Sequence, residues 1–198
     1  MNPLIVSSAI FGHTFEIHLF GLISAIVSST IYPIYIQSMV SGKETPPRST
    51  WFMWLVLDVI AFMSRWDGGV FDAQLVAYIT GTFFTFLFTL KYGKRGWSKD
   101  ETYCSLFVVA SILIWKVNPS LATACAISGI TVATWPLFKN LLKGGYSNRT
   151  TWSLATVGSL FNIADGQLLT GIWFSGIQIA LLASVVYHWG WTRTPEKN

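Results

Sequence analysis

The sequence predicts an all-α membrane protein in which seven transmembrane helices form two parallel three-helix repeats joined by a linker helix. Hydrophobic residues make up 52% of the 198 residues and charged residues only 11%, which leaves too little polar surface to cover a soluble globule. Apolar stretches long enough to cross about 30 Å of hydrocarbon recur along the chain. One sequence pattern also occurs twice, which indicates an internal duplication.

The repeated pattern is an aromatic residue followed by proline near the end of a long apolar stretch, then a short polar run, then a new apolar stretch that begins at tryptophan. The first copy runs from Tyr32-Pro33 to Trp51, and the second from Trp135-Pro136 to Trp152. Weaker echoes follow, because an Asp-Gly pair recurs at 67–68 and 165–166. A unit of three helices accounts for this spacing.

Seven apolar stretches are the candidate spans, and we place them at 16–41, 50–65, 73–92, 102–117, 119–142, 151–165 and 171–190. Within a single membrane domain of 1–198, the first repeat covers about 16–92 and the second about 119–190. The helix at 102–117 is the linker, since two three-helix units run parallel only when an odd number of helices separates them. Residues 1–12 are expected to form an interfacial lead-in.

The basic residues predict the orientation. Eleven of the thirteen fall in segments on one side of the predicted spans, and only Arg65 and Lys116 fall on the other. The positive-inside rule then places the amino terminus outside and the carboxyl terminus in the cytoplasm, in a plasma membrane or bacterial inner membrane. Because these residues lie in short loops between spans, the net charge of +4 does not indicate a nucleic-acid partner.

Three helices, a linker and three more, with a proline near the cytoplasmic end of each first helix, resemble the superfamily of SWEET and SemiSWEET sugar facilitators, PQ-loop proteins and KDEL receptors. The resemblance implies hinge prolines at Pro33 and Pro136 and covers nearly the whole chain. The sequence departs from the PQ motif, because Ile34 and Leu137 stand where the family has glutamine. It also has no proline between Pro47 and Pro119, where SWEET-type proteins carry one.

Asp58 is the first candidate site residue. It lies seven residues beyond Trp51, roughly 10 Å deeper along a helix, among apolar neighbours. A carboxylate there costs at least about 2.5–3.5 kcal/mol on insertion scales, so we expect it to face the bundle interior. It is either a solute or proton site or a structural residue bonded to a neighbouring helix. Trp54 and Asp58 share one helix face.

The register of the repeat places Ser159 opposite Asp58, with Asn162 one step further on. Gln178 is a further candidate for the cavity lining. Four threonines on the third helix also qualify, although threonine in a membrane helix often bonds its own backbone; they are Thr80, Thr82, Thr85 and Thr89. One carboxylate facing a hydroxyl and an amide suits a polar or cationic solute, or a proton, better than an anion.

Trp51, Trp152, Pro33 and Pro136 are candidates for gates or hinges. The two tryptophans are either gates, stacking platforms or anchors at the membrane interface. The two prolines each remove a backbone hydrogen bond inside a span, which produces either a hinge or a static kink. Matching positions in the two repeats favour paired functions.

Metal and cofactor chemistry has no visible basis in the sequence. The three histidines are scattered, no H-E-x-x-H pair occurs, and the two cysteines do not form a cluster. We therefore expect no enzyme activity, no cofactor and no metal site.

The function expected from these features is passage of a small polar solute by alternating access, either passive or linked to protons. The alternative is a membrane receptor or sensor of the same fold that binds a ligand without moving it. The sequence leaves the solute and the oligomeric state open.

Overall fold

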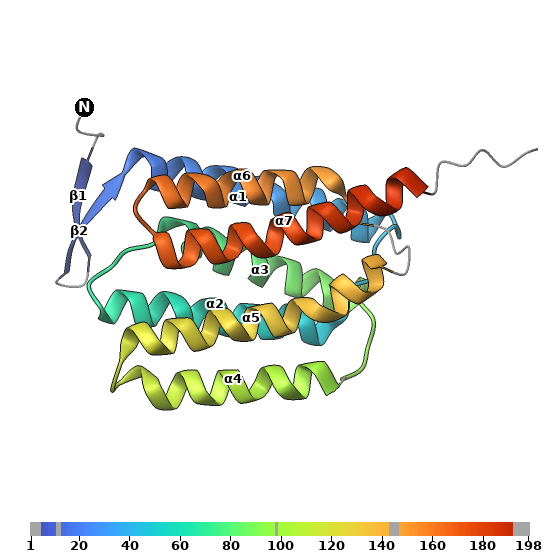
Figure 1. Cartoon of the computed structure of the whole chain (residues 1–198). Helices are drawn as coiled ribbons and strands as arrows, with labels where there is room; N and C mark the ends of the chain where they lie inside the picture. Colours follow the sequence, from blue (N-terminus) through green and yellow to red (C-terminus); the bar gives the residue numbers. More distant parts are fainter. Residues whose placement is uncertain (1–4, 11–12, 98, 143–146, 192–198) are drawn as a thin grey trace, which may run out of the picture.

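The computed structural model describes residues 5–10, 13–97, 99–142 and 147–191. Within these residues the chain forms a short β-hairpin followed by seven helices (Figure 1). The elements are β1 (Ile5–Ile10), β2 (His13–His18), α1 (Leu19–Val40), α2 (Arg48–Asp67), α3 (Ala73–Tyr92), α4 (Lys99–Trp115), α5 (Pro119–Leu142), α6 (Arg149–Ala164) and α7 (Leu168–Trp191).

The helices form a membrane-type bundle. Four of them contain stretches long and apolar enough to cross a membrane: Leu19–Val40, Ala73–Tyr92, Pro119–Lys139 and Leu168–Tyr187. The apolar part of α4, Thr102–Trp115, is shorter. Large apolar side chains face outward along the bundle, with Leu106 62% and Leu113 72% exposed on α4. An outer surface of this kind fits lipid rather than water, and the protein is therefore a helical membrane protein.

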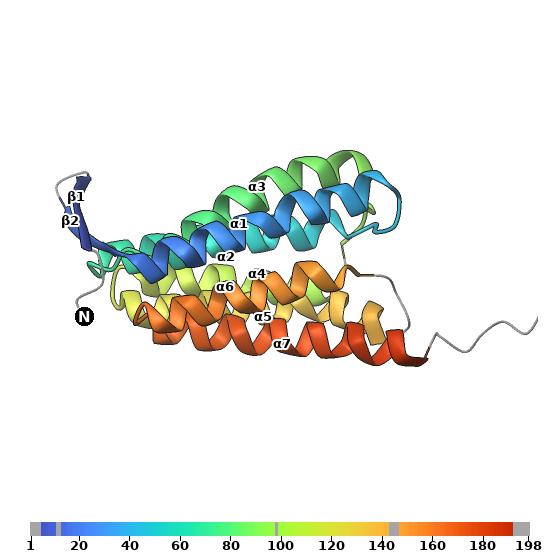
Figure 2. The same ribbon diagram turned by 90° about the horizontal axis from the view of Figure 1, so that it is seen from above.

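The helices pack in a regular order. In the first half α3 packs against both α1 and α2, and in the second half α7 packs against both α5 and α6. The two halves meet where α1 packs on α6 and α2 packs on α5, while α4 packs on α5 and α2. Figure 2 shows α1 to α3 on one side and α5 to α7 on the other.

Small residues allow α1 and α6 to approach closely. The Ser24 hydroxyl donates to the Gly158 carbonyl at 2.7 Å, and a Cβ at Gly158 would lie 2.5 Å from the Ser28 hydroxyl oxygen. Alanine at this position would force the Ser28 side chain to move. Close packing through glycine and serine is the usual way in which membrane helices associate, and here it brings the halves together.

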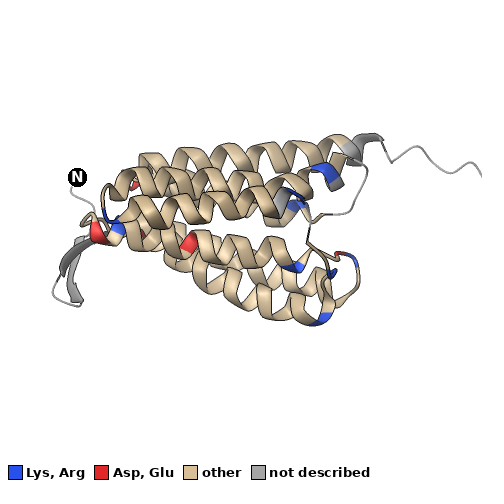
Figure 3. Cartoon of the chain, turned by 90° about the horizontal axis from the view of Figure 1, so that it is seen from below, with Lys and Arg blue, Asp and Glu red and all other residues tan. Residues whose placement is uncertain are grey.

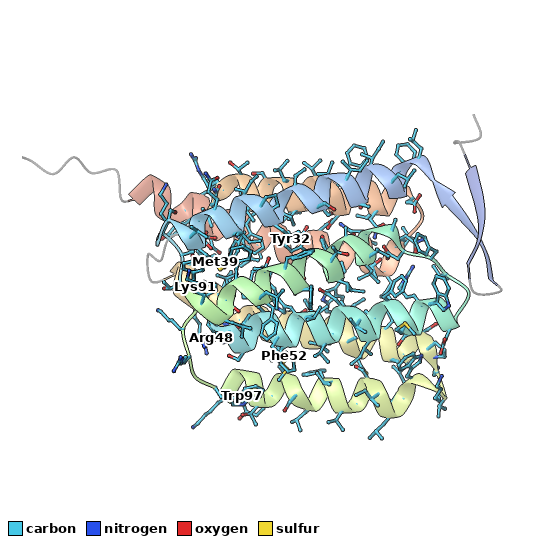
Figure 4. The ribbon with its side chains drawn as sticks, turned by 180° about the vertical axis from the view of Figure 1, so that it is seen from behind. Tyr32, Met39, Arg48, Phe52, Lys91 and Trp97 are labelled. Atoms are coloured by element: carbon cyan, nitrogen blue, oxygen red, sulfur yellow. The ribbon has the colours of Figure 1, made fainter. Side chains whose placement is uncertain are left out.

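The two ends of the bundle differ in charge. We call the end that carries β1 and β2 the hairpin end. The opposite end, where the described residues Lys43, Arg48, Lys91, Lys94 and Arg95 gather, is the basic end (Figure 3). Figure 4 shows Arg48, Lys91 and Trp97 together there.

Part of the expected lead-in forms a strand. Residues 5–10 of the predicted interfacial segment form β1, whereas 1–4 and 11–12 lie outside the described residues. The first helix begins at Leu19 rather than at 16, because 13–18 form β2, paired antiparallel to β1. The alternation of Phe15 and Ile17 with polar neighbours is typical of a strand. The other predicted spans agree with the observed helices to within a few residues at each end.

Asp-Gly pairs end the second and sixth helices, as the sequence echo indicated. After α2 the chain turns through Gly68 and Gly69, and after α6 it turns through Gly166. Gly69 has φ 78° and Gly166 has φ 84°, in the left-handed region that favours glycine. The two turns place the next helices, α3 and α7, back along the bundle.

Candidate functional site

A cavity of about 80 Å³ lies between the two halves, in the part of the bundle nearer the basic end. A cavity of this size exceeds the roughly 10–15 Å³ that one water molecule needs. Residues from α1, α2, α3, α5, α6 and α7 line it. They are Ile31, Tyr32, Tyr35, Trp51, Trp54, Asp58, Tyr78, Thr82, Ile130, Thr134, Thr151, Trp152, Ala155, Phe174, Ile177, Gln178 and Leu181.

Asp58 lines this cavity from α2 and is only 5% exposed. One carboxylate oxygen accepts a hydrogen bond from the Thr82 hydroxyl at 3.2 Å. Within the described part of the chain no lysine or arginine pairs with it. The carboxylate thus combines a single hydrogen-bond donor with access to the cavity, an arrangement that leaves it able to meet a ligand.

Thr82 differs from the other three threonines of α3 that the sequence singled out. The hydroxyls of Thr80, Thr85 and Thr89 donate to carbonyls of their own helix. Only Thr82 bonds a neighbouring helix, because its hydroxyl donates to a carboxyl oxygen of Asp58 on α2. The periodicity of α3 did not distinguish this residue from the others.

Aromatic rings make one wall of the cavity. The ring centroids of Tyr35 and Trp51 are 4.9 Å apart, and those of Trp51 and Trp54 are 4.8 Å apart. Trp51 is 5% exposed and Trp152 is 7% exposed, and both line the cavity. The interpretation of these two tryptophans as anchors at the membrane interface is wrong, because such anchors lie on the outer surface.

A buried polar network lies beside the cavity, on the side toward the hairpin end. The Gln74 amide nitrogen lies 3.1 Å from the Ser28 hydroxyl, 2.9 Å from the Tyr78 hydroxyl and 3.0 Å from the Ser159 hydroxyl. Gln178 donates to the Tyr78 hydroxyl at 2.7 Å and accepts from Ser159 at 2.8 Å. The network joins α1, α3, α6 and α7, and so crosses between the two halves.

The structure separates the residues predicted to share a site with Asp58. Trp54 and Gln178 line the cavity with it, whereas Ser159 belongs to the network and makes no hydrogen bond to Asp58 within the described residues. The repeat register predicted Ser159 opposite Asp58, but Gln178 and Tyr78 occupy its hydrogen bonds. Asn162 lies further toward the hairpin end and belongs to another cluster.

That second cluster, which we call the Asp72 cluster, joins the two halves at the hairpin end. The fully buried Asp72 carboxylate lies 3.5 Å from the Arg65 guanidinium and accepts from Thr170 at 2.8 Å. Its other oxygen caps α3 by accepting from the Leu75 N–H at 3.2 Å. Asn162 donates to Thr170 at 3.2 Å, and Arg65 donates to Gln167.

At the basic end, Glu44 occupies a similar position between the halves. It precedes α2 and is only 5% exposed. One carboxylate oxygen accepts from the Asn148 N–H at 3.1 Å and from the Ser147 hydroxyl at 3.4 Å. The Ser147 hydroxyl in turn accepts from the Trp152 indole N–H at 2.8 Å. Burial raises the pKa of Glu44 to about 7, against the opposing hydrogen bonds from Tyr35, Asn148 and Ser147.

Both predicted hinge prolines lie inside helices that continue beyond them, Pro33 in α1 and Pro136 in α5. Pro33 faces a groove between α1 and α3, to which Gly81 also contributes. The Tyr32 ring packs where a side chain at Gly81 would stand, because a Cβ there would lie 2.0 Å from the ring. Neither proline lines the cavity.

Sequence reasoning missed Gln74, Tyr78 and Glu44. Gln74 carried a usable signal, since a buried amide inside a predicted span is as unusual as the Gln178 that was chosen. Tyr78 had no signal, because tyrosine is common in membrane helices. Glu44 resembled any solvated acid in a polar loop. It is buried because the chain just before α6, at Ser147 and Asn148, packs against it.

The geometry defines the class: a helical membrane protein with a cavity between its two halves, one buried carboxyl group in it, and a carboxylate-centred cluster toward each end. Comparison with family models, with curated proteins and with solved structures gives no match for this chain.

Proposed function

We propose that the protein transports a small polar solute by alternating access, with Asp58 at the central site. The main observation in support of this proposal is the cavity. It lies between the two halves, and both halves contribute to its lining, so a change in their relative position would alter access to Asp58. Binding sites in many membrane transporters lie at such an interface between repeats.

The proposal includes the finer architecture, in which α1 to α3 and α5 to α7 are parallel repeats, α4 is the linker and all seven helices span the membrane. The packing order supports it. The third helix of each unit lies between the other two, and the contact of α1 with α6 is matched by the contact of α2 with α5. A two-fold axis along the membrane normal would relate α1 to α5 and α2 to α6, and so would relate these two contacts to each other.

The orientation in this proposal has the basic end in the cytoplasm of a plasma or bacterial inner membrane. Lysine and arginine collect at that end of the bundle (Figure 3), as the positive-inside rule expects. Reporter fusions after Lys94, Lys143 and the carboxyl terminus should all report cytoplasm. An external signal at any of the three would contradict the orientation and the parallel repeats.

Two clusters, one on each side of the cavity, support alternating access in particular. The Asp72 cluster and the Glu44 contacts each link the first half to the second. A transporter needs contacts of this kind because it must close one side while the other is open. The paired Pro33 and Pro136 would supply flexibility in α1 and α5.

The alternative is a receptor or sensor that binds a ligand in the same cavity without moving it. Uptake into proteoliposomes separates the two functions. A transporter accumulates or equilibrates a labelled solute across the vesicle membrane, whereas a receptor shows saturable binding without entry. Asp58→Asn is the site variant, and Asp67→Asn, at an exposed pair with Lys116, is its control. Equal uptake by the two variants would remove Asp58 from the proposed site.

A further inference from the structure

The cavity lining is rich in aromatic rings and contains a single carboxyl group. Seven of its seventeen residues are aromatic, and Asp58 is the only acid among them. The lining contains no lysine, arginine or histidine. A ring face presents negative electrostatic potential, as a carboxylate does, so both features favour a cation. The same features disfavour an anion.

The hydrogen-bonding groups of the lining are mostly engaged within the protein. Thr134 donates to its own helix, Gln178 bonds Tyr78 and Ser159, and Tyr32 bonds the Tyr78 carbonyl at 3.4 Å. A solute with many hydroxyls, or a primary ammonium with three N–H donors, would therefore find few acceptors. A fully alkylated ammonium has no N–H to satisfy, and it is attracted to ring faces.

Two buried polar atoms of the lining lack a hydrogen-bond partner: the Trp54 indole nitrogen and the Thr151 hydroxyl oxygen. Trp54 is four residues before Asp58 on α2, so the two side chains are neighbours on one helix face, roughly 5–6 Å apart at Cβ. A ligand with its charge at Asp58 could place an oxygen at the Trp54 N–H. A buried donor without a partner costs free energy that such a ligand would recover.

We propose that the cavity binds a small organic cation with an alkylated ammonium group, which the aromatic wall and Asp58 hold while a nearby oxygen accepts from Trp54. This inference rests on the proposed function only in taking the cavity as the ligand site. It names the class of solute that the site selects.

Titration calorimetry on the purified full-length protein tests the selection with matched probes. Choline carries the charge, 3,3-dimethylbutan-1-ol has the same shape without it, and ethanolamine has a primary ammonium in place of the alkylated one. We expect choline to bind at least roughly tenfold more tightly than either. Equal or tighter binding of the neutral alcohol, of ethanolamine or of glucose would overturn the inference.

Variants assign the contacts. Asp58→Asn should weaken choline binding at least roughly tenfold without changing that of the neutral alcohol, while the surface variant Asp67→Asn changes neither. Trp54→Phe keeps an aromatic ring but removes the N–H together with part of the indole, a loss of ring area that both cations share. It should therefore weaken choline binding more than binding of tetramethylammonium, which has no oxygen. A choline affinity that Asp58→Asn leaves unchanged in a folded protein would overturn the site.

Uptake of labelled choline into proteoliposomes separates this inference from the proposed function. Saturable choline binding without entry would support the cavity chemistry and contradict transport. Entry of a neutral solute that choline does not inhibit would support transport and overturn the cation site. Entry of choline that tetramethylammonium inhibits supports both.

Discussion

The two ends of the bundle each bury one carboxylate between the halves, but they treat its charge differently. At the hairpin end, Asp72 has a cation beside it, caps a helix and accepts from Thr170. At the basic end, Glu44 accepts only from neutral groups, and no lysine or arginine within the described residues pairs with it. The first contact is held by charge, whereas the second depends on whether Glu44 carries a proton.

This difference indicates how the ends would respond to conditions. Separating Asp72 from Arg65 without solvation leaves an uncompensated buried charge, which is costly. Ionising Glu44 also puts a charge in a buried position, so the basic end weakens as the pH rises. The contacts between the halves are therefore more sensitive to pH at the basic end, which the proposed orientation places in the cytoplasm.

The largest expected effect is loss of the cation at the hairpin end. Arg65→Met should lower the free energy of unfolding by about 3–5 kcal/mol, because the Asp72 carboxylate stays buried without its partner. Denaturant titration in mild detergent measures this loss. Lys116→Met is the matched control, since its side chain is 81% exposed and its pair with Asp67 is worth at most about 1 kcal/mol. Equal losses in the two variants would show that the Asp72 cluster contributes no more than a surface pair.

The next effect is a pH dependence at the basic end. The pKa of Glu44 is raised from 4.5 to about 7, so the protonated form is favoured in the closed structure. Its contribution is complete below about pH 4.5 and is lost as the pH rises through about 7, a change of about 3 kcal/mol in the free energy of unfolding. Glu44→Gln should abolish this part of the pH profile. If the variant and the unmodified protein lose stability equally between these pH values, Glu44 is not the responsible group.

The smallest effect concerns the hydrogen bond from Trp152 to Ser147. Trp152→Phe replaces the indole by a smaller ring and removes the donor, and the lost hydrogen bond should cost about 1 kcal/mol of stability. Trp97→Phe removes a similar bond, to Thr102, at a side chain that is 56% exposed. It should cost less, because solvent can replace the lost partner there. Thermal unfolding of both variants makes the comparison, and a larger loss for Trp97→Phe would contradict the role of Ser147 at the basic end.

The sequence predicted the helices and the cavity carboxylate better than it predicted the clusters. Helices follow from local apolar length, so the predicted apolar stretches agree with the observed helices to within a few residues at each end. A charge inside an apolar stretch marked Asp58 in the same local way. Glu44 and Asp72 needed the packing of distant segments, since their partners Asn148 and Thr170 are far away along the chain.

The partners of Ser159 have the same physical origin. A duplicated register predicts equivalent positions, but the two halves differ in side chains at the interface. On α3, Gly81 has the Tyr32 ring against it, whereas on α7 no atom lies within 4 Å of a Cβ built at Gly176. The third helices α3 and α7 therefore do not present equivalent surfaces, and Ser159 bonds Gln178 and Tyr78 rather than facing Asp58.

The most direct test of alternating access is the distance across each end in a lipid bilayer. Spin labels at Lys43 and Thr150 report the basic end, and labels at Val70 and Leu168 report the hairpin end, with Cys104 and Cys125 replaced. All four labelled positions are exposed. We expect two distance populations at each end. At the basic end, the share of molecules with the longer distance should be larger at pH 8 than at pH 5. At the hairpin end, the share with the shorter distance should be larger at pH 8. One fixed distance at each end, unchanged by pH and by choline, would contradict alternating access.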